Sequence, residues 1–215
     1  MGAELTAILD ASLRVLDRDT ERMLRFQAGE AACFDELVTQ YRKAMLGFIY
    51  RMVRDAAAAE ELTQEAFLRV YLHRERYRPE ARFSTWLYRI ANHLALNYLR
   101  DHRRDRLHDS LDAPLEEGAE PRELADHRPN QEQDLVAASL DAQRRARVRD
   151  AIGALPERQR AAVIMHKYQG LDYEEIAAAL ELSASATKSL LFRAYESLRR
   201  QLQDLVAGVA VKVTS

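Results

Sequence analysis

The chain has 215 residues, which suffices for one large domain or for two domains of about a hundred residues each. Its formal net charge of −2 gives no indication of a nucleic-acid partner, and its single cysteine, Cys33, excludes an internal disulfide framework and favours a reducing compartment. The hydrophobic content of 47%, with only seven glycines and five prolines, predicts an all-α fold. The sequence shows neither a signal peptide nor an apolar run of about 20 residues, so we expect a cytoplasmic protein without membrane insertion.

The first half of the chain predicts a helical bundle. Residues 4–16 read as a short amphipathic helix within an N-terminal extension, residues 1–18. Helices are then expected from Asp19 to Gly29, over 31–54, and from about 57 to 76. The segment 77–82 is a loop, because Pro79 disfavours helix at the residue before it. Together with the helix that follows, these segments form a predicted domain, residues 19–108.

The helix predicted from Arg82 to Arg106 has two unlike faces. Its apolar side carries Trp86, Leu87, Ile90, Ala91, Leu94 and Tyr98 at helical spacing, which predicts a buried stripe. The opposite side carries Arg89, His93, Asn97, Arg100 and Arg104. Such cationic and amide groups suit a phosphate backbone and base edges, although many charged helix faces are merely solvated.

Charge alternates in sign along the chain. Residues 69–106 contain ten arginines and four acidic residues, whereas residues 107–134 contain nine acidic residues and two arginines. The second stretch also holds Pro114, Gly118, Pro121 and Pro129 and few large apolar side chains. We therefore expect a flexible acidic linker over residues 109–133, which would let two domains move independently.

The second half predicts a helix-turn-helix domain, residues 134–205, followed by a tail, 206–215. Helices are expected over 134–154, from Pro156 to about Tyr168, over 173–180 and from 184 to about 205. Asp172 and Glu175 form a capping-box pattern, and Ser183 is the predicted cap of the last helix. The outward positions near the start of that helix are Ser185, Lys188, Ser189, Phe192 and Arg193, which suit a DNA major groove.

Two further segments are candidate sites. In the loop from Tyr77 to Phe83, aromatic side chains beside arginines could stack unpaired bases; Tyr77 and Phe83 are the predicted stackers, and Trp86 is predicted to be core. Acidic residues around Glu60 could instead border a protein contact, although residue types alone favour a solvated face. The six histidines show no metal-ligand pairing and no glycine-rich phosphate loop is present, so neither an enzyme nor a cofactor is expected.

These motifs resemble the extracytoplasmic-function (ECF) group of the sigma-70 family, bacterial two-domain transcription initiation factors. The stretch ELTQEAFLRV from Glu61 resembles the polymerase-clamp helix of that family, and RFSTWLYRIA from Arg82 resembles its melting motif. LPERQR from Leu155, YEEIA from Tyr173 and TKS from Thr187 resemble its second domain. The resemblance implies core RNA polymerase (its largest-subunit clamp and flap), promoter DNA and an anti-sigma factor as partners.

The resemblance also implies roles for individual residues. The polymerase-binding set is Asp55, Glu60, Glu61, Leu62, Gln64, Glu65 and Phe67. The set for binding and melting the minus-ten element is Tyr77, Arg78, Arg82, Phe83, Ser84, Arg89, His93, Asn97, Arg100, Arg103 and Arg104. The set for binding the minus-thirty-five element is Ser185, Lys188, Ser189, Phe192 and Arg193, the outward residues of the last helix. The chain departs from the family pattern at His93, where asparagine is common, and at Leu190 and Tyr195, where arginines are usual.

Two other functions stay open at this stage. A stand-alone helix-turn-helix transcriptional regulator would explain the second domain, but not the acidic helix or the aromatic loop. A helical adaptor protein would fit if Leu190 and Tyr195 face a protein partner.

Overall fold

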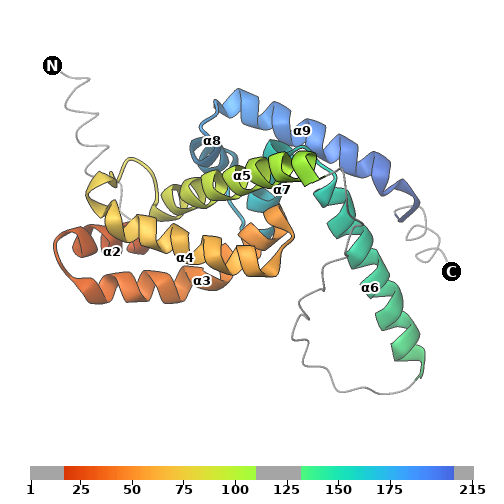
Figure 1. Cartoon of the computed structure of the whole chain (residues 1–215), viewed down its shortest axis with the longest axis horizontal. Coiled ribbons are helices and arrows are strands. Elements are labelled where there is room, and N and C mark those ends of the chain that lie inside the picture. Colours follow the sequence, from red (N-terminus) through yellow and green to blue (C-terminus); the bar gives the residue numbers. More distant parts are fainter. Residues whose placement is uncertain (1–16, 110–131, 206–215) are drawn as a thin grey trace.

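The computed structural model describes residues 17–109 and 132–205, and every regular element in these two ranges is helical. The elements in chain order are α2 (Arg18–Gln27), α3 (Ala31–Val53), α4 (Ala56–Leu72), the 3-10 helix η1 (Arg74–Arg76), α5 (Phe83–Asp109), α6 (Glu132–Gly153), α7 (Glu157–Tyr168), α8 (Tyr173–Leu180) and α9 (Ala184–Gln201) (Figure 1). The all-α class is confirmed. The helix predicted over 4–16, nearly all of the predicted linker and the tail lie outside the described residues.

The first four helices pack around one apolar centre. Its fully buried members include Met23, Leu37, Met45, Phe48, Ile49, Met52 and Leu87. The left-handed backbone of Arg54, with φ 61°, ends α3, and the Asp55 carboxylate caps α4 by accepting from the Ala58 N–H at 2.9 Å. The helix predicted from 57 to 76 is in fact two elements, because α4 ends at Leu72 and η1 follows.

The helix ends of the second half follow their predicted caps. The Asp172 carboxylate accepts from the Glu175 N–H at 2.8 Å, and the Glu175 carboxylate accepts from the Asp172 N–H at 2.9 Å, which completes the capping box. The Ser183 hydroxyl accepts from the Ala186 N–H at 3.1 Å and starts α9. Pro156, predicted in the first turn of α7, is instead its extended N-cap residue.

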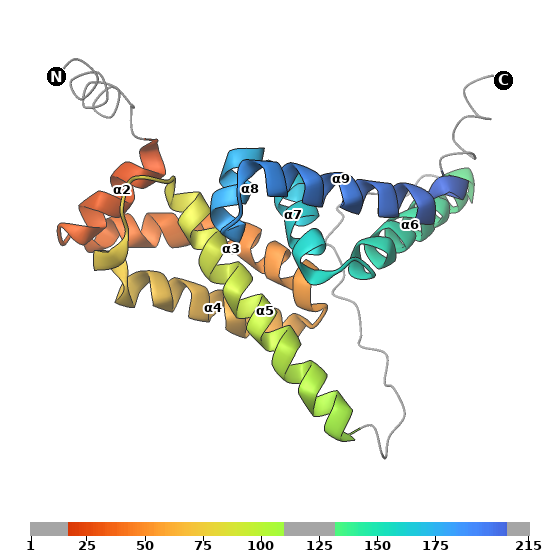
Figure 2. The same ribbon diagram turned by 90° about the horizontal axis from the view of Figure 1, so that it is seen from above.

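The two halves are packed against each other. α5 lies between α3 and α4 on one side and α8 on the other, and α7 contacts α3 (Figures 1 and 2). A single hydrophobic cluster runs through both halves, joining Phe48 and Met52 of α3 to Ile152 and Leu155. Independent movement of the two domains stays a prediction from the linker.

Candidate nucleic-acid interface

The polar side predicted for α5 is present and mostly open to solvent. The exposed members are His93, Asn97, Arg100, Arg103 and Arg104, whereas Arg89 is half-buried. Of the predicted residues that precede them, Arg78 and Arg82 are exposed and Ser84 is partly buried. Of the predicted apolar stripe, Leu87, Ala91 and Leu94 are buried, whereas Trp86, Ile90 and Tyr98 are only partly buried. Helical periodicity thus separated the two faces but did not give the degree of burial along the apolar one. The exposed row offers hydrogen-bond donors to phosphates and base edges.

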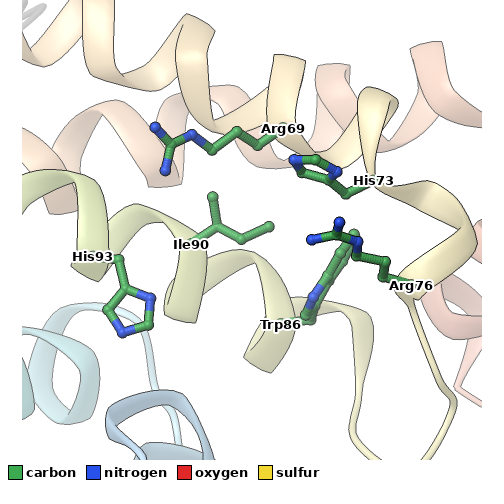
Figure 3. Close-up of a pocket in the computed structure, with 6 residues that line it drawn as sticks. All are labelled: Arg69, His73, Arg76, Trp86, Ile90 and His93. Carbon is green, nitrogen blue, oxygen red and sulfur yellow. The ribbon is translucent and has the colours of Figure 1, made fainter.

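A cavity of about 250 Å³ opens between the end of α4 and the start of α5 (Figure 3). It is lined by Arg69, His73, Arg76, Trp86, Ile90 and His93. α5 supplies the indole and the aliphatic side chain, while the guanidinium groups come from α4 and η1. Arg69 also pairs with Glu65, with 2.7 Å between Nε and Oε1. An aromatic wall with cations beside it suits an unpaired nucleotide, whose base stacks on a ring while its phosphate meets a guanidinium.

Tyr77 and Phe83 are core residues, so the prediction that their rings stack bases is wrong. Their exposed fractions are 2% and 0%. The Tyr77 hydroxyl donates to the Ala81 carbonyl at 2.9 Å, and burial raises the pKa of this phenol. The Phe83 N–H donates to the Thr20 hydroxyl at 3.2 Å. The loop thus folds its aromatic side chains inward, against α2.

Trp86 was predicted to be a core residue, but it is less buried than Tyr77 and Phe83. The sequence places it in the buried stripe of α5, but its indole is only partly buried and borders the cavity. One side of the ring packs on Tyr77, with 5.2 Å between the ring centroids. Of Tyr77, Phe83 and Trp86, it is Trp86 that lines the cavity.

Four side chains of the predicted minus-ten set contact the second half of the chain. Arg82 Nη1 lies 2.8 Å from Glu175 Oε1, and Arg103 Nη2 lies 2.6 Å from Glu157 Oε1. His93 Nε2 lies 3.6 Å from Glu181 Oε2, and Arg89 Nη1 lies 3.9 Å from Glu181 Oε1. Arg89 also donates two hydrogen bonds, of 3.2 and 2.9 Å, to the Ala178 carbonyl of α8.

The predicted protein-binding residues lie on α4 with different exposures. Glu60, Glu61 and Gln64 are exposed, and Leu62 and Glu65 are partly buried. Asp55 is exposed, but both oxygens of its carboxylate accept hydrogen bonds within the chain. One caps α4, and the other accepts from the Tyr98 hydroxyl at 3.2 Å. Its hydrogen bond from the Ala58 N–H lowers the pKa of the Asp55 carboxyl.

Phe67 is buried, which contradicts its predicted place in the protein-binding set. Its exposed fraction is 7%, and it belongs to the core cluster. Instead, Leu68 and Leu72 are exposed, with exposed fractions of 48% and 60%. They continue the helical stripe of Glu61 and Gln64 at spacings of four residues, a signal that the sequence already contained. The α4 face, defined here as Glu61, Gln64, Leu68 and Leu72, joins polar groups to an apolar patch.

The helix-turn-helix presents its predicted reading side to solvent. The residues Ser185, Lys188, Ser189, Phe192 and Arg193 of α9 are all exposed. Phe192 has an exposed fraction of 65%, and it lines a shallow groove with Tyr173, Lys188, Tyr195 and Arg199. Lysine, arginine and serine side chains can donate to bases and phosphates, and a phenyl ring can pack on a thymine methyl group.

Leu190 is buried in the second domain, whereas Tyr195 is partly buried and borders the groove beside Phe192. Leu190 is 9% exposed, and the Tyr195 hydroxyl lies 2.6 Å from His166 Nδ1 on α7. Burial lowers the pKa of His166 and raises the pKa of Tyr195 to about 12. The adaptor hypothesis required both residues to face a partner, and the burial of Leu190 contradicts that requirement.

Comparison with known families identifies both halves. Residues 37–105 match Sigma-70 region 2, and residues 145–198 match Sigma-70, region 4. The RNA polymerase sigma-H factor of Pseudomonas aeruginosa is 35% identical over 193 residues, which cover 88% of this chain and 96% of that protein. The ECF RNA polymerase sigma-E factor of Escherichia coli K12 is 32% identical over 182 residues, which cover 85% and 93%. The chain belongs to the ECF group of the sigma-70 family. It is a transcription initiation sigma factor, as the sequence motifs predicted.

Solved structures of other sigma factors share the fold of this one. RpoE of Bartonella quintana, in complex with the anti-sigma factor NepR, matches with a TM-score of 0.60 and 19% identity over 79% of this chain and 96% of that chain. CnrH, in complex with the cytosolic domain of CnrY, matches with a TM-score of 0.61 and 22% identity over 87% and 99%. Within the described part of this sigma factor, no helix combines the length and the hydropathy needed to cross a bilayer.

Proposed function

We propose that this sigma factor binds core RNA polymerase through the α4 face. We propose further that it contacts promoter DNA with two other surfaces, the cavity with the polar side of α5 and the exposed side of α9. One observation supports the proposal most directly. The α4 face, which has the composition of a protein interface, lies on the same helix that borders the cationic cavity between α4 and α5. The α4 face suits a polypeptide partner, and the cavity suits an unpaired nucleotide. A stand-alone helix-turn-helix regulator would use α8 and α9 but would leave both features without a purpose.

The α4 face would engage the clamp of the largest polymerase subunit. Exposed Leu68 and Leu72 supply apolar area, and Glu61 and Gln64 supply polar groups at its border. An apolar centre with a polar rim is the usual composition of a protein interface. The second domain would sit near the polymerase flap.

The cavity and the polar side of α5 would hold the non-template strand of the minus-ten element. An unstacked base would enter the cavity and pack on Trp86, with Arg76 near the phosphate. Arg100, Arg103 and Arg104 would follow the duplex just upstream. Capture of unstacked bases would offset the cost of unstacking, about a few kcal/mol per step, so that melting needs no hydrolysis.

The exposed side of α9 would read the minus-thirty-five element in the major groove. A helix N-terminal half that carries Lys188 and Arg193 suits guanine acceptors and phosphates. The sigma factor would act in the cytoplasm, where polymerase and promoters are found. Since the RpoE and CnrH structures are complexes with NepR and CnrY, a regulatory anti-sigma protein is a further proposed partner.

Co-purification with core polymerase tests the proposal. A chain with Glu61→Lys and Leu68→Ala should lose the complex, since a repulsive charge and a lost apolar contact coincide on one face. Glu196→Lys, at an exposed position of α9, is the matched control and should retain the complex. If the unmodified protein never joins core enzyme, or if both variants bind equally well, the assignment of the α4 face fails.

A further inference from the structure

Two histidines from different elements line the cavity between α4 and α5. His73 is the C-terminal cap of α4, and His93 lies on α5, about two helical turns after Trp86. Figure 3 shows the two imidazoles at opposite ends of the cavity, with Ile90 between them. His73 was not among the residues predicted to bind DNA, and His93 stands where asparagine is common in the family. The cavity therefore contains two side chains that change charge between neutral and mildly acidic pH.

The charges that face His73 are mainly positive. Arg69, one turn earlier on α4, and Arg76 of η1 line the same cavity. The nearest carboxylates are paired: Glu65 lies 2.7 Å from Arg69 Nε, and Glu75 pairs with the preceding arginine at 3.5 Å. Within the part of the chain that the structure describes, the His73 imidazole has no hydrogen-bond or ion-pair partner. An anion in the cavity would supply the missing counter-charge, and the C-terminal end of a helix favours a cation.

The surroundings of His93 leave its ring available as well. Its Nε2 lies 3.6 Å from Glu181 Oε2, and Arg89 Nη1 lies 3.9 Å from the other oxygen of that carboxylate. One carboxylate thus faces two basic side chains, and the His93 side chain is 50% exposed. If His93 served only its pair with Glu181, protonation would strengthen that pair and would leave strand binding unchanged or weaker. The sign of a pH effect on strand binding therefore distinguishes the two roles.

We infer that His73 and His93 are further contacts for the unpaired strand, and that they bind its phosphates in their protonated form, so that strand capture takes up protons. A protonated imidazole donates charge-assisted hydrogen bonds from both ring nitrogens, whereas the neutral ring has one donor. A bound phosphate in turn favours the protonated form. Affinity for single-stranded DNA thus increases as the pH falls. This inference rests on the proposed function, because it requires the strand to enter the cavity.

Fluorescence anisotropy with the full-length chain tests the inference. The probe is oligo(dT) carrying tetramethylrhodamine, and affinity is measured at pH 7.5 and pH 6.0 at one ionic strength. Since a histidine ordinarily titrates near pH 6.5, its protonated fraction rises about eightfold over this range, and affinity should rise by up to about eightfold per histidine. A chain with His73→Asn and His93→Asn should bind weakly and equally at both pH values. His166→Gln, at a histidine of α7 outside the cavity, is the control and should keep the pH effect.

A permanent positive charge at both positions separates a strand contact from a merely structural role. A chain with His73→Arg and His93→Arg should bind oligo(dT) tightly at both pH values, because its cations do not titrate in this range. The inference is overturned if the asparagine variant keeps the whole pH effect. It is also overturned if the unmodified protein binds equally well, or more weakly, at pH 6.0.

Trp86→Ala distinguishes a failure of this inference from a failure of the proposed function. The change removes the ring on which a base would pack and leaves the charges of the cavity unaltered. Weaker oligo(dT) binding by this variant, with no pH effect in the unmodified protein, would keep the strand site and remove the two histidines from it. Unchanged binding by this variant, or no binding of oligo(dT) by the unmodified protein, would refute the strand site and the inference together.

Discussion

Replacing Tyr77 with phenylalanine separates a structural tyrosine from a base-stacking one. The change keeps the aromatic ring and removes only the hydroxyl, which donates to the Ala81 carbonyl at 2.9 Å and lies 3.1 Å from the Thr20 hydroxyl. Leaving a buried polar partner unsatisfied costs about 1–3 kcal/mol. For a chain of this size each kcal/mol lowers the melting temperature by about 2–4 °C. We therefore expect a fall of about 4–8 °C for a cost near the middle of that range.

Thermal unfolding followed by circular dichroism measures this loss, and Tyr71→Phe at a half-exposed ring is the matched control, with an expected change near zero. Promoter binding by the Tyr77→Phe protein at a temperature where it is folded should equal that of the unmodified protein. The reasoning would be refuted by an unchanged melting temperature together with weakened binding to single-stranded promoter DNA. That result would mean that the tyrosine leaves the core and meets a base.

Three other changes test the remaining assignments. Trp86→Ala should reduce permanganate reactivity of promoter thymines by at least several-fold, because one base-stacking partner is worth about 1–3 kcal/mol, while Trp86→Phe retains most of the effect. Arg193→Ala should weaken binding to minus-thirty-five duplex and lower the slope of log K against log salt by about one unit, as measured by anisotropy titrations, and core binding should not change. Burial lowers the pKa of His166, so the unfolded chain takes up the proton at higher pH than the folded chain, and the free energy of unfolding should fall as the pH drops below about 6.5. Denaturant titrations at neutral and acidic pH should show this fall, and the His166→Gln variant should show a smaller one.

The sequence predicted well the features that depend on neighbours along the chain. The capping box at Asp172 and the Ser183 cap are local hydrogen bonds, and both are present as predicted. Leu87, Ala91 and Leu94 of α5 are also buried as predicted, since helical periodicity divides a helix into faces. The outward residues of α9 are exposed for the same reason.

Periodicity failed where a face is covered by a distant segment. Nothing near Tyr77 in the sequence indicates that α2 supplies Thr20 and Gln27 to hold its loop; the Gln27 amide donates to the Tyr77 carbonyl at 3.1 Å. Phe67 is buried and Leu68 is exposed because the packing of α4 fixes its rotation, which residue types alone do not reveal. Cross-domain pairs such as Arg82 with Glu175 join residues 93 positions apart, so only the fold brings them together.

The ion pairs between the two domains are open to solvent. Side chains of Arg82, Arg103 and Glu181 in the ion pairs have exposed fractions of 62%, 71% and 57%. Pairs this open to solvent contribute about 0–1 kcal/mol each, and salt weakens them. The Arg160 hydrogen bond to the Met52 carbonyl adds roughly 1.5–3 kcal/mol, the range for a bond to a charged group.

The contact between the domains also contains apolar side chains, because one hydrophobic cluster includes Phe48 and Met52 of α3 and Ile152 and Leu155 of the second half. The solvent-exposed ion pairs therefore contribute only part of the free energy that holds the domains together. Arg82 and three side chains of α5 (Arg89, His93 and Arg103) have carboxylate partners on α7, on α8 and at the C-terminal cap of α8, so separation of the domains would leave these cations without those partners.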